Sequence, residues 1–88
     1  MPKIALVDDE QSILTSVSLS LQSEGFTVDT FLNGVEALEA LESKSYDLGL
    51  FDIKMPKMDG NELLSKVRSS KIENLKDLPI IFFNVKRS

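Results

Sequence analysis

Two short apolar runs in this chain each end in acidic residues, and this feature constrains the fold more than any other. The first run is Ile4-Ala5-Leu6-Val7, which leads into Asp8-Asp9-Glu10. The second is Leu48-Gly49-Leu50-Phe51, which leads into Asp52. Short runs that are apolar on both faces are typical of buried strands in a parallel sheet. If these two strands are neighbours, the carboxylates of Asp8, Asp9 and Asp52 converge at one edge of the sheet.

The remaining sequence alternates between helical and strand patterns. Residues 52–60 are expected to form a loop, because Pro56 and Gly60 interrupt regular structure, and residues 69–77 are a polar connection. We predict strands over residues 3–7, 26–31, 48–51 and 78–83, and helices over residues 11–24, 35–44 and 61–68.

This alternation predicts a three-layer, doubly wound α/β fold of the flavodoxin-like order. Its sheet is expected to be parallel, with right-handed crossovers and helices on both faces. Open sheets of this kind place their sites at the carboxyl ends of strands, where the strand order reverses. Here that point lies between the first and third strands, where Asp8, Asp9 and Asp52 are placed.

The amino-acid composition limits the kinds of functional site that the chain can form. The 88 residues carry a net charge of −4 without a basic stripe, which argues against direct nucleic-acid binding. Without Cys or His, the chain has no thiol nucleophile and no imidazole base, and any metal must be held by oxygen. No apolar run approaches the roughly 20 residues of a membrane span, and Met1-Pro2-Lys3 leads directly into a strand. We therefore expect no signal peptide and a cytoplasmic location.

Three close carboxylates repel one another, by about 4 kcal/mol for each pair at an intermediate dielectric. A divalent cation removes this repulsion. Mg²⁺ usually takes one or two carboxylates with waters and a phosphate oxygen, which fits Asp52 with either Asp8 or Asp9. The backbone carbonyl of Lys54 is a further candidate ligand. A carboxylate beside the cation can accept a phosphoryl group and form an acyl phosphate.

A single acid after a strand is more commonly a solvated loop residue or a helix cap than part of a site. For Asp8-Asp9 alone, both interpretations are about equally supported, and the addition of Asp52 favours the site. Met55-Pro56 and Asp59-Gly60 are interpreted as turn residues that shape the loop, with Asp59 as a cap for the following helix.

Three segments of the chain resemble the receiver domain of two-component response regulators. They are Leu6-Val7-Asp8-Asp9-Glu10, Leu50-Phe51-Asp52-Ile53-Lys54-Met55-Pro56-Lys57-Met58-Asp59-Gly60 and Leu78-Pro79-Ile80-Ile81-Phe82, and the resemblance runs from residue 3 to about residue 82. It implies that Asp52 is the phosphoacceptor and that Mg²⁺ is held by Asp9, Asp52 and the Lys54 carbonyl. Asp8 would support the site directly or through a water molecule. A sensor histidine kinase would supply the phosphoryl group.

The sequence departs from this family at its end. Asn84 and Val85 stand where the family has a switch Thr or Ser followed by a small residue. The phosphate-contacting Lys, the last strand and the last helices have no counterpart, and Lys86 follows the wrong strand to replace that Lys. We therefore divide the chain into an incomplete receiver domain, residues 1–83, and a tail outside the family pattern, residues 84–88. A one-base frameshift near Phe83 is one hypothesis for this ending, which the nucleotide sequence of the gene would decide.

These departures leave alternatives open. The chain is not expected to be a conventional enzyme, and Mg²⁺-dependent self-phosphorylation is the most that it would catalyse. One alternative is a truncated receiver that no longer switches and only binds Mg²⁺ or a kinase. A carboxylate-nucleophile phosphatase is less well supported, because Lys54 stands where such an enzyme needs a second acid. The uncovered fourth strand predicts self-association through that strand or through the tail.

Overall fold

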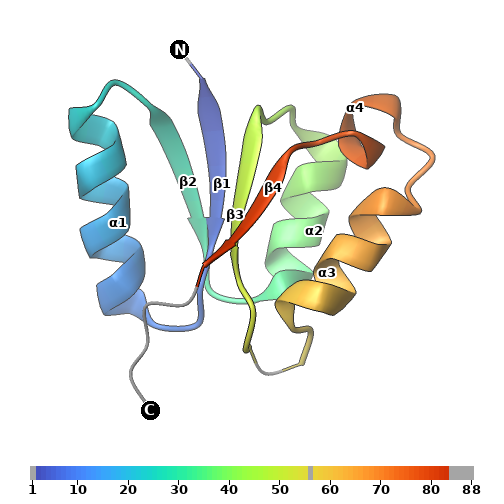
Figure 1. Ribbon diagram of the computed structural model, residues 1–88, viewed down its shortest axis with the longest axis horizontal. Helices are drawn as coiled ribbons and strands as arrows, with labels where there is room; N and C mark the ends of the chain where they lie inside the picture. Colours follow the sequence, from blue (N-terminus) through green and yellow to red (C-terminus); the bar gives the residue numbers. More distant parts are fainter. Residues whose placement is uncertain (1, 56, 84–88) are drawn as a thin grey trace.

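The computed structural model describes residues 2–55 and 57–83 and shows a four-stranded parallel sheet between helices (Figure 1). In the sheet the strands follow the order β2-β1-β3-β4. Helix α1 covers one face, and α2 and α3 cover the other. The strands are β1 Lys3–Val7, β2 Thr27–Phe31, β3 Leu48–Asp52 and β4 Ile80–Phe83, and the helices are α1 Gln11–Ser23, α2 Gly34–Ser43, α3 Gly60–Arg68 and α4 Glu73–Lys76. The predicted three-layer, doubly wound fold is confirmed.

Local signals in the sequence account for three of the helix ends, namely the starts of α2 and α3 and the end of α1. The side chain of Asn33 caps α2 by accepting a hydrogen bond of 2.9 Å from the backbone N–H of Glu36. Asp59 caps α3 in the same way through the N–H of Glu62, also at 2.9 Å, as the sequence predicted. Gly25 follows α1 with a φ of +97°, a left-handed conformation that glycine adopts without strain.

The register between β1 and β3 places the two acidic strand ends beside each other. Ile4 lies opposite Leu48 and Val7 lies opposite Phe51, so the next positions along each strand are Asp8 and Asp52. The predicted adjacency of the first and third strands is therefore confirmed.

The two faces of the sheet are covered unequally. The face beneath α2 and α3 holds a continuous buried cluster that includes Val7, Phe51 and Leu63, all fully buried. On the other face, Leu6 of β1 and Leu14 of α1 are buried. Beyond the reach of α1, Leu50 is half-buried and Ile81 is 54% exposed, so the α1 face carries apolar surface over β3 and β4.

The structure differs from the prediction in the segment before β4. The predicted polar connection contains the short helix α4, whose Leu75 is buried in the core. Arg68 holds this segment by donating hydrogen bonds to the carbonyls of Lys76, at 3.0 Å, and Leu78, at 2.7 Å. The fourth strand accordingly begins at Ile80, two residues later than predicted. In the described ranges, no helix has the length and apolar character needed to cross a membrane.

Tyr46, in the loop before β3, joins this loop to the first two strands. Its hydroxyl donates a hydrogen bond of 2.6 Å to the Asp29 carboxylate in β2. The Lys3 ammonium lies 3.6 Å from the same Asp29 oxygen and 5.1 Å from the centre of the Tyr46 ring. Burial, and then the hydrogen bond and negative charge of Asp29, raise the pKa of Tyr46 well above its ordinary value of 10.0.

The substitution Tyr46→Phe tests this contact. We expect it to lower the free energy of unfolding near pH 7 by about 1 kcal/mol, because the hydrogen bond is lost at a partly exposed position. Since the folded pKa is raised, the contribution of Tyr46 is complete below about pH 10 and is lost as the pH rises further. Urea denaturation followed by circular dichroism should therefore show a smaller difference between the two proteins at about pH 11 than at about pH 8. A difference that stays constant over this range would contradict the assignment.

Candidate functional site at the carboxyl edge of the sheet

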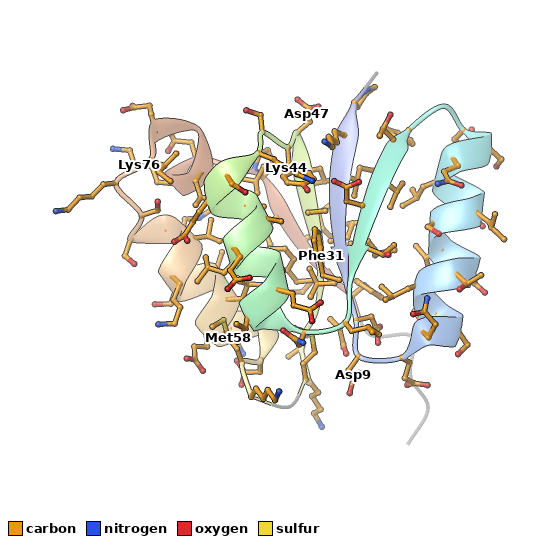
Figure 2. The ribbon with its side chains drawn as sticks, turned by 180° about the vertical axis from the view of Figure 1, so that it is seen from behind. Asp9, Phe31, Lys44, Asp47, Met58 and Lys76 are labelled. Carbon is orange, nitrogen blue, oxygen red and sulfur yellow. The ribbon has the colours of Figure 1, made fainter. Side chains whose placement is uncertain are left out.

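The predicted acidic cluster is present at the carboxyl edge of the sheet. Asp8 and Asp9 follow the last residue of β1, and Asp52 is the last residue of β3. One carboxylate oxygen from each residue lies within 4.8 Å of the other two. Figure 2 shows Asp9 at this edge, while Lys44 and Asp47 lie at the opposite end of the sheet. Residues 44 positions apart in sequence are thus brought together by the pairing of β1 with β3.

Asp8 is the most deeply enclosed member of the cluster. Its side chain is fully buried, and one carboxylate oxygen accepts a hydrogen bond of 2.9 Å from the N–H of Glu10. Its own N–H donates to the carbonyl of Phe31 at 3.1 Å, which fixes the end of β1 against β2. These contacts hold Asp8 in place, and Asp8 in turn supports the chain turn that carries Asp9. Asp9 itself is exposed.

Asp52 is also buried, with 1% of its surface exposed, and lies between strands on both sides. Its carboxylate is 3.4 Å from the backbone nitrogen of Lys54, the second residue of the loop after β3. Lys54 as a whole is exposed. The structure thus places the backbone nitrogen of Lys54 beside the Asp52 carboxylate.

The donor set fits a divalent cation. In an octahedral Mg²⁺ shell with bonds of about 2.0–2.1 Å, ligand oxygens lie about 3 to 4.2 Å apart. The three carboxylate oxygens, within 4.8 Å of one another, need little adjustment to reach these spacings. Two of the three carboxylates are buried, and buried charges are stable when they are paired or coordinate a metal. The residues present can therefore hold Mg²⁺, with no nitrogen or sulfur ligand.

Gly60 allows the helix α3 to begin directly against Asp52. A Cβ atom at this position would lie 2.6 Å from the Asp52 carbonyl oxygen and 2.9 Å from the Phe82 ring. The N–H of Gly60 donates a hydrogen bond of 2.8 Å to the carbonyl of Ile53. From the sequence, Gly60 was interpreted as a turn residue. In the structure, the reason for a glycine at this position is close packing. Asp59 caps α3 and is not a member of the acidic cluster.

Two features of the loop between β3 and α3 were not predicted from the sequence. Lys57 adopts a φ of +72°, which is uncommon for a residue other than glycine. Met58 packs its main chain against Gly34, the first residue of α2. No local pattern signals the second contact, because it joins residues 24 positions apart in sequence. Four residues that were discussed from the sequence lie outside the described residues. They are Pro56, Asn84, Val85 and Lys86.

Comparison with known proteins gives a consistent result. The protein family described as "Response regulator receiver domain" matches residues 4–88. A curated relative, the transcriptional regulatory protein CpxR homolog of Haemophilus influenzae, is 44% identical over 75 residues, which are 85% of this chain and 32% of the relative. The chain spans 29%, 32% and 36% of the length of three of the curated relatives that it matches, and 11% of another.

Solved structures show the same similarity. Chemotaxis protein CheY4 of Vibrio cholerae superposes with a TM-score of 0.90 and 35% identity, covering 100% of this chain and 72% of that one. Response regulator protein TrrA of Thermotoga maritima in complex with Mg²⁺-BeF has a TM-score of 0.78 and 42% identity, covering 81% of this chain and 62% of that one. The structure of histidine kinase ThkA in complex with TrrA gives a TM-score of 0.86 and 39% identity, covering 100% of this chain and 72% of that one.

The substitution Gly60→Ala tests the close packing behind Asp52. We expect it to lower the free energy of unfolding by about 2 kcal/mol, because the added methyl group overlaps the Asp52 carbonyl and the neighbouring ring. Asn61→Ala, at the next and exposed position, is the matched control and should change stability by less than about 0.5 kcal/mol. Urea denaturation measures both. A Gly60→Ala protein as stable as the control would show that the contact is not tight.

Proposed function

The chain belongs to the response regulator receiver domain family, and we propose that it accepts a phosphoryl group on Asp52 from a sensor histidine kinase in a Mg²⁺-dependent reaction. Asp52 is the nucleophile in this proposal. Asp9, Asp52 and the Lys54 carbonyl are the metal ligands, and Asp8 supports the site directly or through a water molecule. A cytoplasmic location, expected from the sequence, is part of the proposal.

The observation that carries this proposal is the burial of Asp52 within a cluster of three acids. Its carboxylate ends the central strand β3, within reach of one oxygen from each of Asp8 and Asp9. A structural role alone gives no reason to place three carboxylates together, since each close pair raises the electrostatic energy. A cation site that also presents one carboxylate for reaction accounts for both their number and their position.

In the proposed step, an oxygen of Asp52 attacks the phosphorus of a phosphohistidine on the kinase. The new P–O bond forms an acyl phosphate as the P–N bond to the imidazole breaks, and the released imidazole nitrogen takes a proton. Bound Mg²⁺ supplies positive charge that offsets the negative charge on the phosphoryl oxygens. The protein contributes position: β3 fixes Asp52, and the buried Asp8 fixes the turn that carries Asp9.

The comparisons support the partner as a class. TrrA, which is 39% identical to this chain, has been solved in complex with a histidine kinase. We propose that this chain is likewise phosphorylated by such a kinase. Because it spans only part of the length of these curated relatives, its output and any effector segment are not assigned.

Incubation with acetyl phosphate and Mg²⁺ tests the reaction without a kinase. We expect intact-mass spectrometry to show one added phosphoryl group on the wild type and none on Asp52→Asn, because the substitution removes the attacking oxygen. Asp59→Asn is the matched control, since it also replaces an aspartate by asparagine but keeps a good helix cap outside the cluster. It should be modified as the wild type is.

Two results would contradict the proposal. Modification of Asp52→Asn to the wild-type extent would place the phosphoryl group on another residue. An unmodified wild type that still binds Mg²⁺ would favour the alternative, a receiver fold that binds the cation or a kinase but does not accept phosphate. Chelation of Mg²⁺ with EDTA should abolish modification in either protein that reacts.

We further propose that the chain associates with a second copy through β4. Among the described strands, β4 pairs only with β3, so its other edge presents unpaired backbone groups. Its sequence, Ile80-Ile81-Phe82-Phe83, contains none of the charged residues that commonly protect strand edges, and Ile81 is 54% exposed. An edge of this kind favours pairing with another strand.

Analytical ultracentrifugation tests this association. The wild type should show dimers or larger species at micromolar concentration, and Ile81→Lys should shift the chain toward monomer because a charge on the strand opposes pairing. Leu19→Lys is the control, since Leu19 is 61% exposed but lies on α1. A wild type that sediments as a single monomeric species would refute the proposal.

A further inference from the structure

The loop that carries Lys54 is anchored at three places. At its start, the N–H of Lys54 lies 3.4 Å from Asp52, and at its end Gly60 donates to the Ile53 carbonyl at 2.8 Å. Between these points, Met55 and Met58 are each only 8% exposed and belong to the core cluster. The position of the Lys54 carbonyl is therefore set by the loop as a whole and not by Lys54 alone.

Besides these three anchors, the loop makes a main-chain contact with α2. A Cβ atom at Gly34 would lie 2.9 Å from the carbonyl oxygen of Met58, 3.0 Å from its Cβ and 3.1 Å from its Cγ. The first of these is a backbone atom, which cannot turn aside as the end of a side chain can. Figure 2 shows Met58 at the same end of the molecule as Asp9, close to the start of α2.

Of the two partners in this contact, α2 is held more firmly. Ala37 and Leu41 bury its inner face in the core, and its first turn is capped by Asn33. The described residues of the loop, 53–55 and 57–59, have no regular secondary structure and include a residue with positive φ, Lys57. A side chain added at Gly34 would therefore displace the loop and leave α2 in place.

We propose that Gly34 is a positioning residue for the metal, acting through Met58 and the loop to hold the Lys54 carbonyl over Asp9 and Asp52. This inference rests on the proposed function, because it requires that the acidic cluster binds Mg²⁺. It adds a residue that lies outside the cluster and that no motif in the sequence identified.

The geometry of the two common cations separates this role from a general effect on stability. Mg²⁺ needs nearly octahedral ligands at about 2.0–2.1 Å, whereas Ca²⁺ accepts irregular shells at about 2.3–2.6 Å. A displaced carbonyl should therefore weaken Mg²⁺ binding much more than Ca²⁺ binding. A variant that is simply less stable would lose affinity for both ions in the same proportion.

Isothermal titration calorimetry of the whole chain with each ion measures this difference; the chain has no Trp to report binding by fluorescence. For Gly34→Ala we expect the Kd for Mg²⁺ to rise about tenfold, a typical effect of disturbing the support of a metal ligand. The Kd for Ca²⁺ should rise about twofold or less. Val35→Ala, at the adjacent and exposed position of the same turn, is the matched control and should leave both values unchanged.

Circular dichroism melts establish that each protein is folded at the titration temperature. If Gly34→Ala does not fold, Met58→Ala takes its place, because loss of the buried side chain loosens the same loop and should shift the ratio of the two Kd values in the same direction. Equal weakening of both ions, or no change for either, in a folded variant overturns the inference. A wild type that binds neither ion overturns the proposed function itself, and this inference with it.

Discussion

The pairing of β1 with β3 is the contact on which the rest of the site depends. Because Val7 lies opposite Phe51 in a parallel ladder, both strands end at the same level and present Asp8 and Asp52 side by side. A shift by one residue would turn every side chain of the strand to the opposite face and move Phe51 out of the core. The apolar side chains therefore fix the position of the acids, and burial of the core opposes their mutual repulsion.

Close packing at glycine positions brings the surrounding segments to this edge. Gly60 lets α3 begin against the Asp52 carbonyl, and Gly34 lets α2 approach the main chain of Met58. Neither glycine has a positive φ, so neither is required by backbone conformation. The small size of both residues lets the starts of α2 and α3, and the loop between β3 and α3, pack closely around the end of β3. In this arrangement one exposed acid, Asp9, and two buried acids, Asp8 and Asp52, lie together at one strand end.

The sequence predicted the sheet and the acidic cluster because their signals are local and strong. Apolar runs such as Ile4–Val7 define the strands, and the rule that parallel strands share their carboxyl edge brings Asp8 and Asp52 together. Other features depend on residues that are distant in sequence. The short helix α4 has Leu75 as a buried anchor in a polar segment, and its position is fixed by Arg68 hydrogen bonds that no periodicity indicates. Likewise, nothing near Tyr46 identifies Asp29 as its partner.

The proposal that the β1–β3 edge forms one divalent-cation site can be tested with crystals that are grown or soaked with Mn²⁺. This ion resembles Mg²⁺ in its preference for oxygen ligands, and it has an anomalous signal. We predict a single anomalous peak within bonding distance of Asp9, Asp52 and the Lys54 carbonyl oxygen, with Asp8 adjacent or joined through water. A peak elsewhere, or no peak at this edge at a Mn²⁺ concentration of several millimolar, would contradict it.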